Sequence, residues 1–154
     1  MKRTTGFTLV EILIVVVLLG ILAAVVIPTV SQGATAARES SLICDLQLMR
    51  RVILVYKAQH LEVAPGNPNG HASPEEAFAA QATKASNAEG QTADPGTTGY
   101  DLGPYLFKVP ENPFNKLNSI RAVDAIGTGS DTAGWQYNPA TGEIRADTAG
   151  YETY

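Results

Sequence analysis

The sequence predicts an α+β protein in which a long N-terminal helix, membrane-spanning in its first half, packs on a small antiparallel β-sheet. Three observations support this class. Beyond Lys2 and Arg3, the first 27 residues are mostly apolar. A helical pattern with one apolar face follows this run, and the last third of the chain contains short segments of alternating polar and apolar residues that are typical of strands. The 154 residues leave room for one modest domain.

The apolar run covers residues 7–27. As a helix, these 21 residues span about 31 Å, close to the roughly 30 Å of a bilayer core. Lys2 and Arg3 precede the run, which places the N-terminus in the cytoplasm and the rest of the chain outside. A secretory signal peptide with cleavage after residues 34–36 is the alternative, although its apolar region is usually about 7 to 15 residues long. We therefore expect a single membrane-spanning helix.

Glu11 places a carboxylate inside the apolar run. Such a group costs about 2.5 to 3.5 kcal/mol near the bilayer centre and less towards an interface. In one interpretation it lies at the helix start, where the helix dipole favours an anion. In the other, cleavage between Gly6 and Phe7 creates an ammonium four residues before Glu11 on the same helix face, which neutralises the carboxylate within or between subunits. Position alone leaves both interpretations open.

Residues 6–11, after a short basic leader and before a long apolar helix, closely resemble the type IV prepilin signal. The family pattern of a glycine, an N-methylated phenylalanine and a glutamate matches Gly6, Phe7 and Glu11. The resemblance implies a pilin-like fold, cleavage after Gly6 by a prepilin peptidase, N-methylation of Phe7, and filament assembly through Phe7 and Glu11. Pro28 lies where such helices commonly carry a proline. We expect it to bend the helix, because it has no backbone N–H to donate.

The expected organisation is a leader (1–6), a transmembrane and filament-core helix (7–27), an amphipathic second half of the helix (28–62) and a globular periplasmic head (63–154). Apolar positions recur at steps of three and four along one face of the second half. The residues of this face are Leu42, Leu46, Met49, Ile53, Tyr56 and His60. Cys44 lies within the same stretch, and we expect its thiol to be buried as a small hydrophobe.

The head begins with a turn-rich segment, residues 64–72. Ser73 then predicts the N-cap of a short helix through about Lys84, with Pro74 at its first position and Glu76 reaching back to the cap. Residues 86–98 are small and polar and are expected to form a flexible surface loop. The strands are expected at residues 119–123, 134–138 and 143–147.

Several segments of the head resemble the major pseudopilin of type II secretion. They are residues 45–47, 54–60, 103–106, 110–114, 133–138 and 141–146. Many type IV pilins close a C-terminal loop with a disulfide, which a chain with one cysteine cannot form. The resemblance implies a structural subunit of a type II secretion pseudopilus that polymerises through its N-terminal helix to drive export of folded proteins. The alternative is a type IV pilin subunit for adhesion, motility or DNA uptake.

The implied partners are other copies of the chain, a prepilin peptidase, minor pseudopilins, the inner-membrane secretion platform and the membrane itself. The implied location is the bacterial inner membrane, and after assembly a filament in the periplasm or outside the cell. A net charge of −4 without a basic stripe argues against nucleic acid. No nucleophile motif, phosphate loop or metal-ligand cluster indicates an enzyme, although a tethered binding module stays open.

No cofactor is expected from the residues, although the pseudopilin resemblance raises calcium in a loop near the C-terminal strands. The candidate ligands are Asp124 and Asp131, which flank a glycine-rich stretch. Calcium requires six to eight oxygen ligands, and two carboxylates do not define such a site. We therefore expect these carboxylates to be solvated and assign no metal ligand.

Overall fold

The computed structural model describes residue 6 and residues 8–154, apart from the side chains of residues 25 and 27–31. The chain divides into two compact units, Met1–Arg38 and Glu39–Tyr154, and helix α1 (Leu9–Gln59) contributes to both. One further helix and several short strands are described in the second unit, which is called the head from here on. The α+β class with a long N-terminal helix is therefore confirmed.

Helix α1 continues through Pro28 to Gln59. The side chain of Pro28 is not among those described, so the expected bend stays a prediction. The helix ends where Leu61 and Glu62 adopt left-handed backbone conformations, with φ of 55° and 64°. The N–H of Glu62 then donates to the carbonyl of Lys57 at 2.9 Å, which satisfies one of the helix's last free acceptors.

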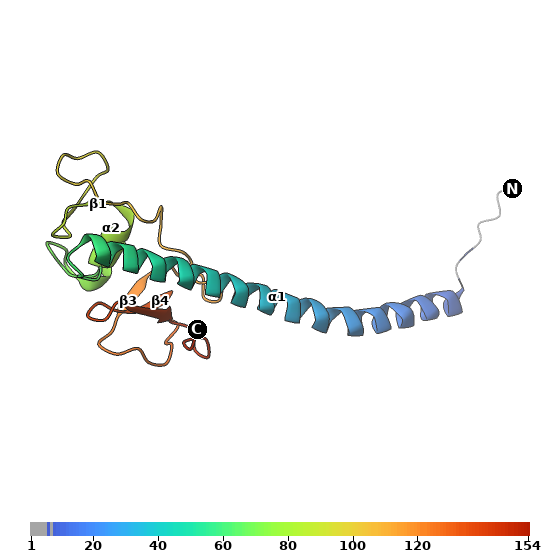
Figure 1. The fold of residues 1–154 in the computed structure, drawn as a ribbon. Coiled ribbons are helices and arrows are strands. Elements are labelled where there is room, and N and C mark those ends of the chain that lie inside the picture. The colour runs from blue at the N-terminus through green and yellow to red at the C-terminus, as the bar shows by residue number, and fades with distance from the viewer. Residues whose placement is uncertain (1–5, 7) are drawn as a thin grey trace. The chain divides into compact units, whose positions relative to one another are not determined.

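The elements of the head follow one another along the chain after α1 (Figure 1). They are α2 (Pro74–Thr83), β1 (Ala85–Ser86), β2 (Thr92–Ala93), β3 (Ile120–Ala122), β4 (Trp135–Asn138) and β5 (Glu143–Ala146). Strands β3, β4 and β5 coincide with the three predicted strands, each shortened by one or two residues. The two-stranded β1–β2 hairpin lies where the sequence predicted a flexible loop, and its Ser86 is fully buried.

The larger sheet among the described residues has the order β3–β4–β5 and is mixed. Strands β4 and β5 pair antiparallel, but β3 and β4 pair parallel, with Ile120 opposite Trp135. The prediction of a purely antiparallel sheet was therefore wrong. The reason is the connection formed by residues 123–134, which is long enough to return the chain to the same end of the sheet before β4 begins.

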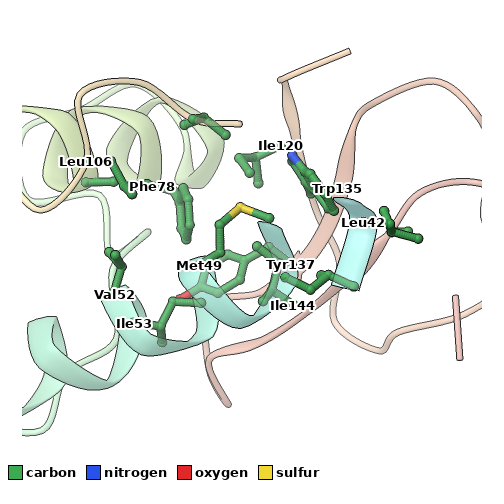
Figure 2. Packing of buried hydrophobic residues seen from close by; sticks show 14 residues of the cluster. Leu42, Met49, Val52, Ile53, Phe78, Leu106, Ile120, Trp135, Tyr137 and Ile144 are labelled. Atoms are coloured by element: carbon green, nitrogen blue, oxygen red, sulfur yellow. The ribbon is translucent and has the colours of Figure 1, made fainter. Parts of the chain in front are cut away.

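The hydrophobic core lies between α1 and the β3–β5 sheet, and it confirms the predicted apolar face (Figure 2). Leu42, Leu46, Met49, Ile53 and Tyr56 are each at most 2 % exposed, and they are called the α1 stripe below. Strand β4 contributes two large aromatic side chains to the other side of the core, Trp135 and Tyr137, and α2 contributes Phe78. Phe78 and Tyr137 pack with their ring centroids 4.6 Å apart, a separation typical of favourable aromatic pairs.

Helix α2 starts as the sequence predicted. The Ser73 side chain accepts a hydrogen bond from the N–H of Glu76 at 3.3 Å, and Pro74 occupies the first helical position. The Glu76 carboxylate reaches back one residue further than expected, because it accepts from the N–H of Ala72 at 3.0 Å. Glu75 in the same turn accepts from the N–H of Ala122, which links α2 to β3.

Two residues near the stripe differ in the burial of their side chains. His60 follows the end of α1 and is buried, with Nδ1 2.8 Å from the carbonyl of Tyr56 and Nε2 3.0 Å from the Ser86 hydroxyl. Cys44 is exposed, so the prediction of a buried thiol was wrong. Its position between Leu42 and Leu46, at about 100° per residue, turns the thiol away from the stripe.

Candidate assembly site and C-terminal loop

The first turn of α1 forms a reciprocal cap. Thr8 precedes the helix and its hydroxyl accepts from the N–H of Glu11 at 3.3 Å. The Glu11 carboxylate in turn accepts from both the N–H and the hydroxyl of Thr8, each at 2.7 Å. This is the capping box that a Ser or Thr followed three residues later by Glu predicts, and Thr8 and Glu11 carry this sequence signal just as Ser73 and Glu76 do.

The capping box places the Glu11 carboxylate at a helix start, which is where one of the two sequence interpretations put it. Both carboxylate bonds come from Thr8, and each oxygen of a carboxylate can accept more than one hydrogen bond. The carboxylate can therefore accept further hydrogen bonds, including one from a cation. Gly6 is exposed, and Phe7 lies outside the described residues. Cleavage, methylation and a charge pair with Glu11 therefore stay predictions.

The N-terminal part of α1 presents apolar side chains on all sides. Every large hydrophobic side chain that is described between Leu9 and Val26 is at least 50 % exposed. Monomeric soluble proteins rarely expose apolar patches of more than a few hundred Å², and larger ones mark interaction surfaces. A helix that is apolar all round is normally buried in a larger core or in lipid.

Within the described part of the chain, no helix combines the length and the apolar character needed to cross a membrane. The membrane-spanning helix that the sequence predicted over residues 7–27 is therefore not confirmed. The predicted span begins at Phe7, outside the described residues, and the side chains of residues 25 and 27 are not described either.

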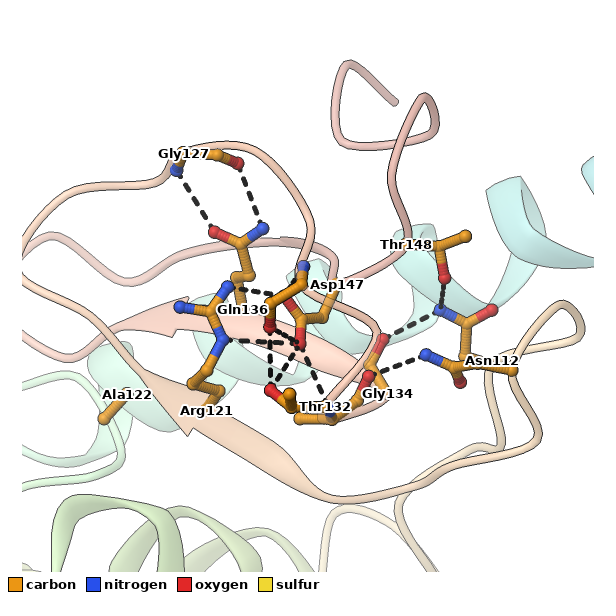
Figure 3. A network of polar contacts seen from close by, with 12 residues as sticks. Asn112, Arg121, Ala122, Gly127, Thr132, Gly134, Gln136, Asp147 and Thr148 are labelled. Atoms are coloured by element: carbon orange, nitrogen blue, oxygen red, sulfur yellow. Dashed lines mark hydrogen bonds and ion pairs between the residues drawn. The ribbon is translucent and has the colours of Figure 1, made fainter.

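A second polar cluster fastens the loop between β3 and β4 to the end of the sheet (Figure 3). The Asp147 side chain is fully buried and accepts from the Arg121 guanidinium, with Nη2 at 2.5 Å and Nε at 3.3 Å. It also accepts from the N–H of Ser130 at 3.0 Å, the hydroxyls of Ser130 and Thr132 at 2.9 and 3.4 Å, and the N–H of Ala133 at 3.0 Å. These donors surround both carboxylate oxygens.

The electrostatics of this cluster favour the ionised carboxylate. Burial by itself would raise the pKa of Asp147, but the hydrogen bonds from Arg121, Ser130 and Ala133 outweigh it and hold the pKa well below its ordinary value. The same pairing raises the pKa of Arg121. Nothing in the sequence marked Asp147 and Arg121 as partners, because they are 26 positions apart, with Arg121 in the middle of β3 and Asp147 directly after β5.

The rest of the loop is tied to β4. The Gln136 amide donates to the carbonyl of Gly127 at 3.0 Å and accepts from its N–H at 3.1 Å (Figure 3). Asn138 donates to the carbonyl of Asp124 at 2.7 Å. Gly129 passes so close to the backbone of Thr148 that a Cβ would lie 2.4 Å from its carbonyl carbon, which is why this position needs glycine.

The structure does not gather a calcium ligand set from the two aspartates considered in the sequence. In the part of the chain that is described, no three or more His, Cys, Asp or Glu side chains are grouped so that they could hold a metal. The buried carboxylate of the region is that of Asp147, whose two oxygens already accept from a guanidinium and from loop donors. The expectation that Asp124 and Asp131 hold no calcium therefore stays a prediction.

Residues 1–27 match the family model described as the prokaryotic N-terminal methylation motif, which confirms the prepilin-type N-terminus. The N-terminus of the chain is thus similar to that of prepilin-type proteins.

Three relatives match most of the chain. The chain is 27 % identical over 152 residues to the type II secretion system core protein G of Vibrio cholerae, covering 88 % of this chain and 94 % of that protein. It is 27 % identical over 126 residues to the protein of the same name from Aeromonas hydrophila, covering 82 % and 78 %. For the Klebsiella pneumoniae protein the values are 27 % over 114 residues, covering 74 % and 71 %. No solved structure matches significantly. The resemblance to the major pseudopilin is therefore confirmed.

The Asp147 cluster predicts how the stability of the head depends on pH. Because the folded-state pKa of Asp147 lies below its unfolded value of about 3.9, its contribution is fully present above about pH 4 and is lost as the pH falls towards the folded-state pKa. We expect Asp147→Asn to unfold more easily than the wild type at pH 7, with a smaller difference at pH 3. Urea unfolding followed by Trp135 fluorescence, in detergent, measures both. An unchanged difference between the two pH values would contradict this assignment.

Proposed function

We propose that this chain is a structural subunit of a type II secretion pseudopilus. Its N-terminal helix polymerises with the helices of other copies, and growth of the filament drives export of folded proteins. The observation that carries this proposal is the apolar surface of residues 9–26, which is exposed on all sides of α1 next to a prepilin methylation motif. The names of the relatives favour a pseudopilus over a type IV pilin.

Processing prepares the helix for assembly. A prepilin peptidase cuts after Gly6 and the new amine of Phe7 is methylated. The resulting ammonium precedes the first residue of α1 by two positions and Glu11 by four, so both charges belong to the start of the helix. In an environment that excludes water, an ion pair between neighbouring subunits relieves the cost of each charge and sets the axial position of one subunit against the next. The acceptor capacity that Thr8 leaves on Glu11 supports this pairing.

Before assembly the subunit lies in the bacterial inner membrane as a single-pass protein. Lys2 and Arg3 keep the N-terminus in the cytoplasm, and the head lies in the periplasm. The assembled filament lies in the periplasm or outside the cell. Other copies of the chain, minor pseudopilins and the inner-membrane platform are its partners. The subunit carries out no catalysis of its own.

The loop between β3 and β4 keeps its shape without a calcium ion. Arg121 supplies the positive charge that the buried Asp147 carboxylate requires, and the loop donates its N–H and hydroxyl groups to the same carboxylate. An arginine that belongs to the chain is permanently charged and always present, so the loop does not depend on the ionic composition of the periplasm.

Calcium and a chelator distinguish this proposal from a calcium-dependent loop. We expect the thermal unfolding midpoint of the full chain in detergent to be the same in millimolar calcium and in excess chelator. A site filled at 100 times its Kd would add about 2.7 kcal/mol to the free energy of unfolding. A midpoint that rises with calcium would contradict the proposal, and Arg121→Ala would then show whether the ion acts at this loop.

Substitution of Glu11 tests the charge pair. Glu11→Gln keeps an acceptor for Thr8 but removes the charge, so we expect the subunit recovered in the sheared filament fraction to fall about tenfold or more, the factor for 1.4 kcal/mol. Thr8→Ala is the matched control, because it removes the cap and keeps the charge, and it should assemble. Filament yields are measured by immunoblot against membrane-bound subunit. Normal yields from Glu11→Gln would rule out the pair as a determinant of assembly.

A further inference from the structure

We draw no further inference here: the strongest candidate, the pocket of about 490 Å³ beside β5 that Asp124, Glu143 and Glu152 line, is a cluster of acidic residues in which no second observation points to a ligand, because Glu143 already pairs with Arg145 and Glu152, whose Oε2 has no partner among the described residues, is only partly buried.

Discussion

Burial of the α1 stripe is the constraint on which the rest of the head depends. The stripe supplies the side of the core that faces Trp135 and Tyr137 of β4, and α2 completes the core with Phe78. The strands are short, and short strands need the cover of a helix to be stable. The loops then fix themselves to this framework with polar side chains, as Asp147 and Gln136 show for the segment between β3 and β4.

The N-terminal part of α1 is exposed, whereas the stripe is buried. From Leu9 to Val26 the large apolar side chains are exposed, so this part of α1 lacks the kind of cover that the stripe receives in the head. A helix with such a surface is stable only when lipid or other helices cover it and keep it from water. In the proposed function, the membrane and then the filament provide these two kinds of cover. In that proposal the helix moves from lipid into contact with other helices, and the Glu11 carboxylate pairs with the ammonium of Phe7.

The sequence was most informative where one local signal decides the structure. The spacing of apolar residues located the α1 stripe, and the Ser73 cap located the start of α2. Alternation around Trp135 and Ile144 located β4 and β5. The sequence was less informative where contacts between residues distant in the chain determine the structure. The parallel pairing of β3 with β4 follows from the path of residues 123–134, and the Arg121–Asp147 pair joins two separate strands.

Other differences have local causes. The β1–β2 hairpin consists of two residues on each strand, too few to show an alternating pattern. Cys44 is two positions from both Leu42 and Leu46, which places its side chain on the other side of the helix from the stripe. The general tendency of cysteine to be buried therefore gave the wrong expectation. The box formed by Thr8 and Glu11 was readable from the sequence, because a threonine followed three residues later by a glutamate is the pattern of a capping box.

The intact mass of the chain recovered from sheared filaments tests the central claim most directly. The account predicts a single species that comprises residues 7–154 and carries one methyl group on the amine of Phe7. A chain that begins at Met1 in the filament would contradict the role given to the new amine. A chain that begins at Ala37, as cleavage after residues 34–36 would produce, would have lost the apolar helix and with it the proposed basis of assembly.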